Sequence, residues 1–462
     1  MNSTHSASAH LVGICGAGMR ALAEVLMDLG WTVSGSDLLT APQSIQKLIH
    51  RGLSFHRGHA AANIPQSVGQ LIYSPAIHAT NVERIEAESR RVPVLSYSQA
   101  VNLLIRKSAG VCIAGTHGKS TTTAMTATIL DQANRLSGVV LGAEVCEGGR
   151  SGWTGNGDLF VAESCEFQRS FLDFDPKYTA ILTVEPDHFD CYGDLKSLEA
   201  AFSDFASRTN SEGLILFNDD SSVSSSVARH ARTMARRASF GTRTTADWQA
   251  TEISQSSTGT TFKLSFRGKS VIQIDLPLHG KHNIWNGLAA AALAAEIGVP
   301  PEMIREGLAN FHGIRRRLER IGERRGILFY DDYAHHPTSV KVTLETLRWI
   351  AGSRRVWCVF QPHQVLRTMV LMEDFAASFA DADEVVVAPV FAARESVTDE
   401  PNSVSRQLAE RITARGVAAR FYPSLDQIVN TLEDAMRPGD IIVTMGAGDI
   451  DRIHHEFTRR VQ

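Results

Sequence analysis

The fold of this chain is decided by the stretch Val111-Cys-Ile-Ala-Gly115-Thr-His-Gly118-Lys119-Ser120-Thr-Thr-Thr-Ala-Met-Thr-Ala-Thr-Ile-Leu130. A short apolar, β-prone segment opens it, Gly115 and Gly118 break that segment, and residues compatible with a helix follow to about Asp131. Strand, glycine turn and helix in this order are typical of a phosphate-binding loop. The glycines let backbone N–H groups close around an anion, and the helix N-terminus adds unsatisfied donors and a partial positive charge.

The match to the full Walker pattern is partial, because Ile113 stands where that pattern has its first glycine. An ordinary strand-to-helix turn with an exposed lysine is therefore the alternative. In the phosphate interpretation, Lys119 reaches the outer phosphates of a nucleotide, and the hydroxyl of Ser120 or Thr121 is a ligand for Mg²⁺. The motifs elsewhere in the chain have to decide between the two.

Length and composition narrow the class of protein. A chain of 462 residues predicts roughly three domains. The net charge of −4, from 46 basic and 50 acidic residues, argues against a surface built to bind nucleic acid. No apolar run approaches the roughly 18 residues that span a bilayer. The cysteines are scattered, without metal-binding spacing, as expected in a reducing cytoplasm. We therefore expect a cytoplasmic protein without nucleic-acid or membrane partners.

A dinucleotide-type fingerprint opens the chain. Gly16-x-Gly18-x-x-Ala21 follows an apolar strand, and a second strand at 32–36 ends at Asp37, near the offset expected of an acid that binds ribose. This pattern indicates a nucleotide diphosphate at the helix without deciding which one, so a nicotinamide oxidoreductase is a competing function. A further strand at 71–77 carries Ser74 in a loop that either faces a substrate or is a plain turn.

Two predicted strands that end in acidic residues follow the phosphate-loop segment. Leu159-Phe-Val-Ala-Glu163 ends in an acid, and the strand from Ala180 runs into Glu185-Pro-Asp-His188. Since ligands of open parallel sheets bind outside the carboxyl ends of the strands, Glu163 and His188 are expected on the same edge as the phosphate loop. There Glu163 can hold Mg²⁺, and His188 can hold a second cation or orient a substrate. A solvated acid and a loop histidine with ordinary partners are the alternatives.

The second half of the chain alternates strands and helices again after one interruption. Residues 242–276 predict an antiparallel hairpin. The polar run 280–286 opens an alanine-rich helix over 287–297, and this run either binds a base or phosphate or caps the helix. The basic run 315–325 fits a domain hinge better than a nucleic-acid site, since no aromatic platform accompanies it. Strands at 327–332, 355–360, 384–390 and 440–444 predict a last doubly wound unit.

The predicted fold class is therefore α/β, with three tandem doubly wound units. A Rossmann-like N-terminal domain is expected over 1–108, a central P-loop ATPase domain over 109–318, and a Rossmann-like C-terminal domain over 319–462.

From His10 to about Ile453 the chain resembles the Mur ligases. The resemblance rests on seven motifs: Gly16-Ala-Gly18-Met, Ser34-Gly-Ser-Asp37, Ala114-Gly-Thr-His-Gly-Lys-Ser-Thr, Glu163 through Glu166 with Glu185-Pro-Asp-His188, Gly280-Lys-His-Asn283, Asp331-Asp-Tyr-x-His335-His-Pro, and Phe360-Gln-Pro-His363. Within the family, the chain is most similar to the members that add L-alanine.

The resemblance implies an ATP-dependent amide ligase of peptidoglycan precursor synthesis. ATP phosphorylates the carboxylate of UDP-N-acetylmuramate, the amino group of L-alanine attacks the acyl phosphate, and ADP and phosphate leave. The implied cofactors are ATP and Mg²⁺, and a monomer or weak homodimer is expected. A related ligase that adds a recycled tripeptide to the same UDP-sugar is the alternative within the family. A phosphate-loop kinase or an NAD-dependent oxidoreductase is the alternative outside it.

The resemblance also implies roles for individual residues. Those implied to bind ATP are Gly115, Thr116, His117, Gly118, Lys119, Ser120, Thr121, Asn283, Arg317 and Asp332. Those implied to bind the UDP-sugar are Gly16, Ala17, Gly18, Met19, Asp37 and Ser74. Tyr333, His335 and Arg367 are implied at the amino-acid pocket; Ser120, Glu163 and His188 at the metal; and Lys119, His188 and His335 in catalysis.

The chain departs from the family pattern at three points. Gln364 stands where an arginine often holds the amino-acid carboxylate, which leaves Arg367 for that role and leaves the preferred amino acid open. Ser120 stands where threonine is frequent and keeps the hydroxyl. Lys196 lies near the position of the carbamylated lysine of some relatives, but no motif matches it there.

Overall fold

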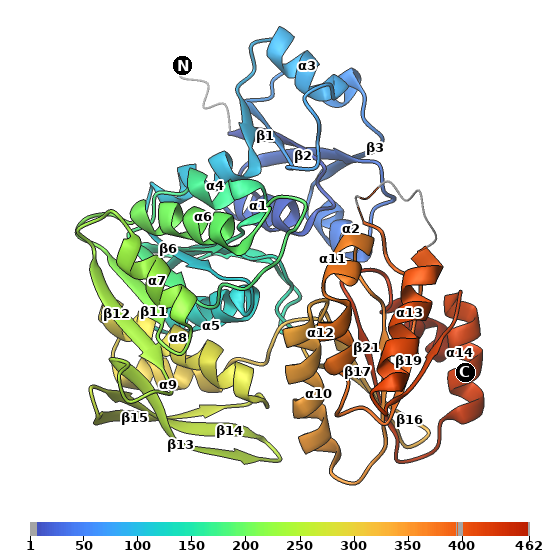
Figure 1. Ribbon diagram of the computed structural model, residues 1–462. Coiled ribbons are helices and arrows are strands. Elements are labelled where there is room, and N and C mark those ends of the chain that lie inside the picture. Colours follow the sequence, from blue (N-terminus) through green and yellow to red (C-terminus); the bar gives the residue numbers. More distant parts are fainter. Residues whose placement is uncertain (1–6, 394, 396–400, 461–462) are drawn as a thin grey trace.

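The computed structural model describes residues 7–393, 395 and 401–460. Within them the chain forms three α/β units, each around its own sheet (Figure 1). The N-terminal unit, blue in Figure 1, lies above the middle unit in green and yellow and the C-terminal unit in orange and red. The predicted fold class, three tandem doubly wound units, is confirmed, while the predicted domain limits at 108 and 318 stay a prediction.

The N-terminal sheet has the order β3-β2-β1-β4-β5, with every pair parallel. Its strands are β1 (Ser8–Val12), β2 (Thr32–Asp37), β3 (Ser54–Arg57), β4 (Gln70–Tyr73) and β5 (Val94–Ser96). Its helices are α1 (Ala17–Asp28), α2 (Gln43–His50), η1 (Ala61–Asn63), α3 (Val82–Ser89) and α4 (Tyr97–Ile105). Because the strands are parallel, the loops after β1, β2 and β4 meet at one edge.

The middle sheet has the order β15-β14-β13-β12-β11-β10-β6-β9-β7-β8. Its strands are β6 (Ala109–Ala114), β7 (Leu136–Val140), β8 (Gly152–Thr154), β9 (Leu159–Ser164), β10 (Tyr178–Ile181), β11 (Leu214–Asn218), β12 (Arg236–Gly241), β13 (Trp248–Ser256), β14 (Gly259–Phe266) and β15 (Lys269–Leu276). Its helices are α5 (Lys119–Gln132), η2 (Phe167–Asp173), α6 (Leu195–Ser207), α7 (Ser222–His230), α8 (Lys281–Ile297) and α9 (Pro301–Ala309).

The phosphate-loop strand β6 sits inside this sheet, between the parallel strands β9 and β10. The expected antiparallel excursion is confirmed, because β13, β14 and β15 pair antiparallel. Helix α8 begins at Lys281, ahead of the predicted start at residue 287. The polar residues of the 280–286 run therefore lie on its first turns, and the helix buries its alanines against α5.

The C-terminal sheet has the order β16-β17-β21-β18-β19-β20. Its strands are β16 (Glu319–Arg324), β17 (Ile327–Asp332), β18 (Val356–Phe360), β19 (Glu384–Val387), β20 (Ala418–Phe421) and β21 (Ile441–Met445). Its helices are α10 (Pro337–Ala351), α11 (Val365–Val370), α12 (Met372–Ala377), α13 (Pro401–Ala414), α14 (Leu425–Ala435) and α15 (Arg452–Arg460). Most of the basic run 315–325 thus forms the antiparallel edge strand β16, and only its start connects the two domains.

Two further sequence expectations concern membranes and cysteines. Among the described residues, no helix combines the length and apolar character needed to cross a bilayer. No disulfide joins the six cysteines, all of which lie in the described part of the chain, and Cys165 and Cys191 are the exposed ones.

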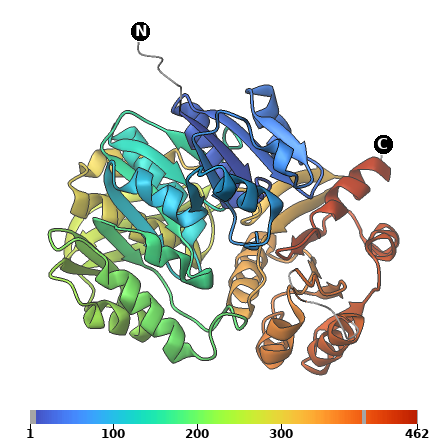
Figure 2. The same cartoon turned by 90° about the horizontal axis from the view of Figure 1, so that it is seen from above.

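Helix α1 packs against β7 and β8 of the middle domain, and the view from above shows the blue N-terminal unit beside the cyan and green part of the middle unit (Figure 2). The buried carboxylate of Glu24 accepts hydrogen bonds from the backbone N–H groups of Ser151 (2.8 Å) and Gly152 (2.6 Å). Arg150 adds an ion pair with Asp28 at 2.6 Å. Buried hydrogen bonds to a charged group contribute about 1.5–3 kcal/mol each, so these contacts stabilise the packing of the N-terminal domain on the middle domain.

Gly152 is predicted to be irreplaceable at this junction. A Cβ on Gly152 would lie 2.2 Å from the carbonyl oxygen of Ala21, where neither backbone can yield, whereas a Cβ at Gly193 would meet nothing within 4 Å. Gly152→Ala is expected to cost at least about 1–3 kcal/mol through overpacking, seen as a lower midpoint of urea unfolding. Equal midpoints for Gly152→Ala and Gly193→Ala would contradict this packing.

Candidate active site

The phosphate loop runs from the end of β6 to α5 and is fixed in shape by its two glycines. Gly115 has φ 149° and Gly118 φ 81°, both in the region that favours glycine. A Cβ on Gly118 would lie 2.4 Å from the side-chain oxygen of Asn286 on α8. The loop is also tied to the segment after β10, because the N–H of Thr116 donates to the carbonyl of Thr183 at 2.6 Å. The loop therefore stands preformed at the carboxyl edge of the sheet.

Lys119 begins α5 and is held at the loop by a carboxylate. Its ammonium lies 2.9 Å from an oxygen of the buried Glu166 and donates to the carbonyl of Gly115 at 2.5 Å. Burial opposes its charge, but Glu166 outweighs burial and raises the pKa of Lys119. The lysine is thus a charged group at the phosphate loop, paired with Glu166, and its contact with a phosphate stays a prediction.

Ser120 and Glu163 lie together, as expected for metal ligands. The Ser120 hydroxyl donates to Glu163 Oε1 at 2.9 Å, and the N–H of Gly142 donates to Oε2 at 2.5 Å. A hydroxyl and a carboxylate are the hard oxygen donors that Mg²⁺ prefers, so the residues present fit this cation. Thr121, the other predicted hydroxyl, is buried in α5.

His188 lies on the same edge and reaches the phosphate loop through Glu166. His188 Nε2 is 3.6 Å from Glu166 Oε1, and its ring packs at 5.4 Å from that of Phe167. Cys165, Glu166 and His188 bring ligand atoms within 4.8 Å of one another. The structure therefore brings Lys119 and His188 together on either side of one carboxylate.

The predicted amino-acid residues sit on the C-terminal side of a buried ion pair. Arg367 on α11 contacts Asp187 of the middle domain with both Nε (2.9 Å) and Nη2 (2.7 Å), and the two side chains are 3% and 7% exposed. The Arg367 guanidinium also lies 3.0 Å from His363 Nδ1. The ring of His335 lies 5.7 Å from His363 and 5.3 Å from Tyr333. Tyr333, His335 and Arg367 thus surround one junction between the two domains.

His335 is held neutral and in one tautomer. Its Nδ1 lies 2.9 Å from the carbonyl oxygen of Tyr333, and a carbonyl only accepts, so the Nδ1–H donates and Nε2 keeps its lone pair. Burial and the Arg367 charge hold the pKa of His335 well below its usual range. The imidazole is therefore neutral at pH 7.

Three other residues predicted to bind ATP come from the end of β17, the segment before β16 and the first turn of α8. Asp332 is buried and accepts from the N–H groups of Leu318 and Ala334, both at 2.7 Å. Burial raises its pKa, and the nearby charge of Arg317 opposes that rise. Arg317 also lies 5.2 Å above the Tyr333 ring. Asn283 donates to the carbonyl of His279 at 2.8 Å, and Asn286 one turn later touches the phosphate loop.

The predicted UDP-sugar residues meet at the carboxyl edge of the N-terminal sheet. Gly16 precedes the first turn of α1, which contains Ala17, Gly18 and Met19. Asp37, at the end of β2, accepts from the N–H of Cys15 at 2.9 Å. Ser74 follows β4, and a Cβ on Gly13 would meet it at 2.9 Å. Met19 is only 2% exposed, so its side chain packs in the core.

Family models cover the three units in chain order. Residues 8–109 match "Mur ligase family, catalytic domain", 113–294 match "Mur ligase middle domain" and 316–448 match "Mur ligase, glutamate ligase domain". A UDP-N-acetylmuramate–L-alanine ligase of Desulfitobacterium hafniense is 38% identical over 96% of this chain and 98% of its own. The chain belongs to the Mur ligase family. The ligase of the same name from Salinibacter ruber is 37% identical over 98% of this chain and 94% of its own.

Solved Mur ligase structures share the fold over the full length. A UDP-N-acetylmuramate–alanine ligase of Thermotoga maritima superposes with a TM-score of 0.82 at 25% identity, covering 98% of both chains. A murein peptide ligase of Psychrobacter arcticus gives 0.73 at 24% identity over 99% of both chains. The second likeness shows the fold alone.

Within this Mur ligase, sequence reasoning missed the charged partners of the predicted residues. Glu166, Glu185 and Asp187 received no role, although all three lie inside motifs quoted for the resemblance. The sequence feature that could have identified them is their position just after β9 and β10, because side chains at the strand ends of a parallel sheet converge. Asn286 was missed because only Asn283 was singled out from the polar turn of α8.

Tyr97 is a further missed residue, and it links the two predicted nucleotide sites of the Mur ligase. Its ring fills the space beside Gly18, where a Cβ would be 2.9 Å away. Burial, together with the charges of Glu163 and Cys165, raises the pKa of Tyr97. The residue therefore stands between the predicted UDP-sugar site and the predicted metal ligands.

A buried carboxylate supports the N-terminal edge and makes its stability depend on pH. Glu83 accepts from Ser36 (2.5 Å) and Asn63 (2.6 Å). Burial opposes ionisation, but the neighbouring His10 imidazole and the hydrogen bonds from Ser36 and Asn63 outweigh it and lower the pKa of Glu83 to about 2. Because the folded pKa lies below the unfolded value, this stabilisation is complete above about pH 4.5 and is lost towards pH 2.

Glu83→Gln is therefore expected to lower the free energy of unfolding by about 3 kcal/mol at pH 7. Urea unfolding at pH 7 and at pH 3 measures the difference from the parent, which should shrink at the lower pH. Glu88→Gln, an exposed change on the same helix α3, is the matched control. A difference that is the same at both pH values would show that Glu83 is not ionised in the fold.

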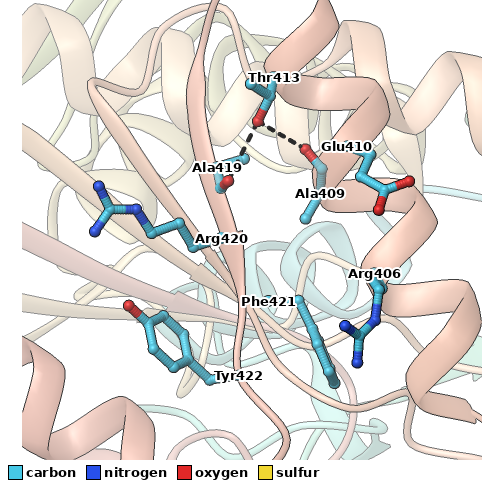
Figure 3. Close-up of a pocket in the computed structure, with 8 residues that line it drawn as sticks. All are labelled: Arg406, Ala409, Glu410, Thr413, Ala419, Arg420, Phe421 and Tyr422. Carbon is cyan, nitrogen blue, oxygen red and sulfur yellow. Dashed lines mark hydrogen bonds between the residues drawn. The ribbon is translucent and has the colours of Figure 1, made fainter.

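An open hollow of about 550 Å³ lies between α13 and β20 of the Mur ligase (Figure 3). Arg406, Arg420, Phe421 and Tyr422 line it, and the Thr413 hydroxyl beside it donates to the carbonyl of Ala409 at 3.0 Å. None of the predicted site residues lines this hollow, so it is separate from the candidate active site.

Proposed function

We propose that this chain joins L-alanine to the carboxylate of UDP-N-acetylmuramate, with ATP converted to ADP and phosphate, as a step of peptidoglycan precursor synthesis. The observation that carries this function is the match to relatives with this activity in their names over 96% and 98% of the chain. The geometry supports it, because Ser120, Glu163 and His188 lie with Lys119 on one edge of the middle sheet. Tyr333, His335 and Arg367 lie at the junction between the middle and C-terminal domains.

Phosphoryl transfer needs positioning and neutralisation of charge more than a covalent nucleophile. In our proposal, the phosphate loop and the Lys119 ammonium hold the outer phosphates of ATP. Ser120 and Glu163 would hold Mg²⁺, with His188 at a second cation. Bound Mg²⁺ supplies positive charge to the phosphoryl oxygens. Asn283, Arg317 and Asp332 bind the rest of the nucleotide from α8 and the C-terminal domain.

The second half-reaction needs a free amine beside the acyl phosphate. We assign the amino-acid pocket to Tyr333, His335 and Arg367, which lie around the Asp187 junction. Arg367 pairs with the carboxylate of L-alanine. The neutral His335 accepts a hydrogen bond from the amine at Nε2 and positions its nitrogen lone pair for attack, while the proton of the ammonium group passes to the solvent. Gly16–Met19, Asp37 and Ser74 hold the UDP moiety in the N-terminal domain.

The tripeptide-adding ligase differs from this proposal only in the amine that it accepts. The ring of Phe391 stacks on that of His363 at 5.7 Å beside the proposed pocket, and the assignment to L-alanine rests on the names of the relatives. We further propose a cytoplasmic location, where nucleotide and UDP-sugar occur, and a monomer or weak homodimer.

Phosphate release from ATP tests the function. We expect release only when UDP-N-acetylmuramate and L-alanine are both present, and the tripeptide should support much slower release. Release with the UDP-sugar and tripeptide but not L-alanine would assign the alternative ligase. An absorbance change with a nicotinamide cofactor and no need for ATP would overturn the proposal, as would ATP consumption without free phosphate, which marks a kinase.

A further inference from the structure

A second group of metal-ligating side chains lies at the junction of the middle and C-terminal domains. His117 of the phosphate loop, Glu185 after β10 and His336 before α10 bring ligand atoms within 4.8 Å of one another. His117 Nε2 is 3.3 Å from Glu185 Oε2, and His336 Nδ1 is 3.9 Å from the same oxygen. Tetrahedral Zn²⁺, with bonds of 2.0–2.2 Å, needs ligand atoms about 3.3–3.5 Å apart, so the His117–Glu185 distance already fits and His336 has to move closer to complete the geometry.

The surroundings of the three side chains fix which of their atoms face one another. His336 Nε2 lies 3.3 Å from the carbonyl oxygen of Pro186, so Nε2 carries the hydrogen. The lone pair of Nδ1 accepts from the backbone N–H of Thr338 at 3.3 Å, a long hydrogen bond that a metal at Nδ1 would replace. His117 Nδ1 lies 3.3 Å from the Ser339 hydroxyl. Thr338 donates to Glu185 Oε2 at 2.7 Å. Partners of this kind orient the ligands of known zinc sites.

Charge and access agree with this geometry. Burial, with the charge of His117, lowers the pKa of His336 to about 4, and hydrogen bonds from His117 and Thr338 outweigh burial to lower that of Glu185 to about 2. A neutral imidazole and an ionised carboxylate are thus present at pH 7, the forms that bind metal. The side chains of His117 and Glu185 are 22% and 33% exposed, which leaves an entry path from solvent.

We propose that His117, Glu185 and His336 form a site for a transition-metal cation such as Zn²⁺ that clamps the middle and C-terminal domains together. Two imidazoles and a carboxylate suit zinc rather than Mg²⁺, which prefers oxygen ligands. The cation replaces the proton shared by His117 and Glu185 and holds the phosphate loop against the start of α10. The inference does not depend on the proposed function.

Cobalt titration of the full chain tests this site, because Co²⁺ reports its ligands by absorption. Cys165→Ser is used as the background, since Cys165 and His188 form a neighbouring cluster. We expect one equivalent with a tetrahedral visible spectrum and no sulfur charge-transfer band. His336→Ala should weaken Co²⁺ and Zn²⁺ binding by more than about 100-fold, beyond the loss typical of removing an outer partner.

His279→Ala is the matched control, because His279 lies at the same junction, 5.2 Å from the Trp349 ring, and outside the cluster. It should bind cobalt as the background does. Since His336 also caps α10, Glu185→Gln provides a second variant that leaves this cap in place and should lose binding too. Zn²⁺ should raise the unfolding midpoint of the background and of His279→Ala alone. No stoichiometric binding, or binding unchanged in both cluster variants, would overturn the site.

Discussion

Lys119→Ala is expected to abolish turnover, with kcat at least about 10³-fold lower than in the parent. The lysine is the cation that the phosphate loop presents, and it is charged because Glu166 pairs with it at 2.9 Å. A preorganised charge aimed at the transferring phosphoryl group acts mainly on the transition state; loss of one neutral donor costs about 10²–10³-fold, and a full charge is expected to lie at the upper end of that range. Steady-state phosphate release measures the effect.

The controls separate this loss of charge from loss of fold. Lys119→Ala leaves Glu166 buried without its cation, so circular dichroism and the urea midpoint must be measured beside activity. The double variant Lys119→Ala/Glu166→Gln removes the stranded charge and should regain stability but not turnover. Lys341→Ala, an exposed change on α10, should behave as the parent does. Near-normal turnover in a folded Lys119→Ala protein would refute the role of this lysine.

Asp187→Ala is expected to raise the KM for L-alanine at least tenfold and to cost about 3–5 kcal/mol of stability. The change leaves Arg367 buried, 3% exposed, without its charged partner, and breaking a buried pair from one side has a cost of this size. Arg367 then loses the orientation in which we propose that it meets the amino-acid carboxylate. Initial rates at varied L-alanine and urea unfolding measure the two effects.

The same pair should respond to pH in a defined direction. Burial opposes ionisation of Asp187, but the Arg367 guanidinium outweighs it and holds the pKa of Asp187 far below its usual range. Its contribution is therefore present above the unfolded value of about 4 and is lost as pH falls below it. The stability gap between the parent and Asp187→Ala should narrow below pH 4.

Glu373→Ala is the matched control for this pair. Glu373 pairs with Arg411 at 2.7 Å, but the two side chains are 57% and 61% exposed. Exposed pairs contribute about 0–1 kcal/mol, so stability and KM should hardly change. An Asp187→Ala protein as stable as Glu373→Ala would mean that Arg367 and Asp187 are not paired in solution.

The sequence predicted those parts of the fold and site that follow from local pattern. The strand, glycine turn and helix from Val111 to Asp131 are present as β6 and α5. Glu163 and His188 were placed on the edge that holds Lys119 because strand ends converge in a parallel sheet. Ser120 and Glu163 indeed lie 2.9 Å apart.

The parts that were missed depend on distant contacts or on exposed strands. The Asp187–Arg367 pair joins residues 180 positions apart, and no spacing rule reports such a pair. Edge strands β16 and β20 were missed because their charged, exposed side chains hide the alternation of a strand, as is common where natural sheets protect an edge. Glu166 was missed for the same reason as the Asp187–Arg367 pair, because it holds Lys119 from across the phosphate loop and no local sequence pattern indicates that contact.

An isotope measurement tests the central claim, that the carboxylate of the UDP-sugar is activated by phosphoryl transfer from ATP. UDP-N-acetylmuramate labelled with ¹⁸O in its carboxylate is turned over with unlabelled ATP and L-alanine, and the released phosphate is analysed by mass spectrometry. When the amine expels phosphate from an acyl phosphate, the bridging oxygen leaves with phosphorus. We predict one ¹⁸O in each phosphate released, and phosphate that carries no ¹⁸O would contradict the account.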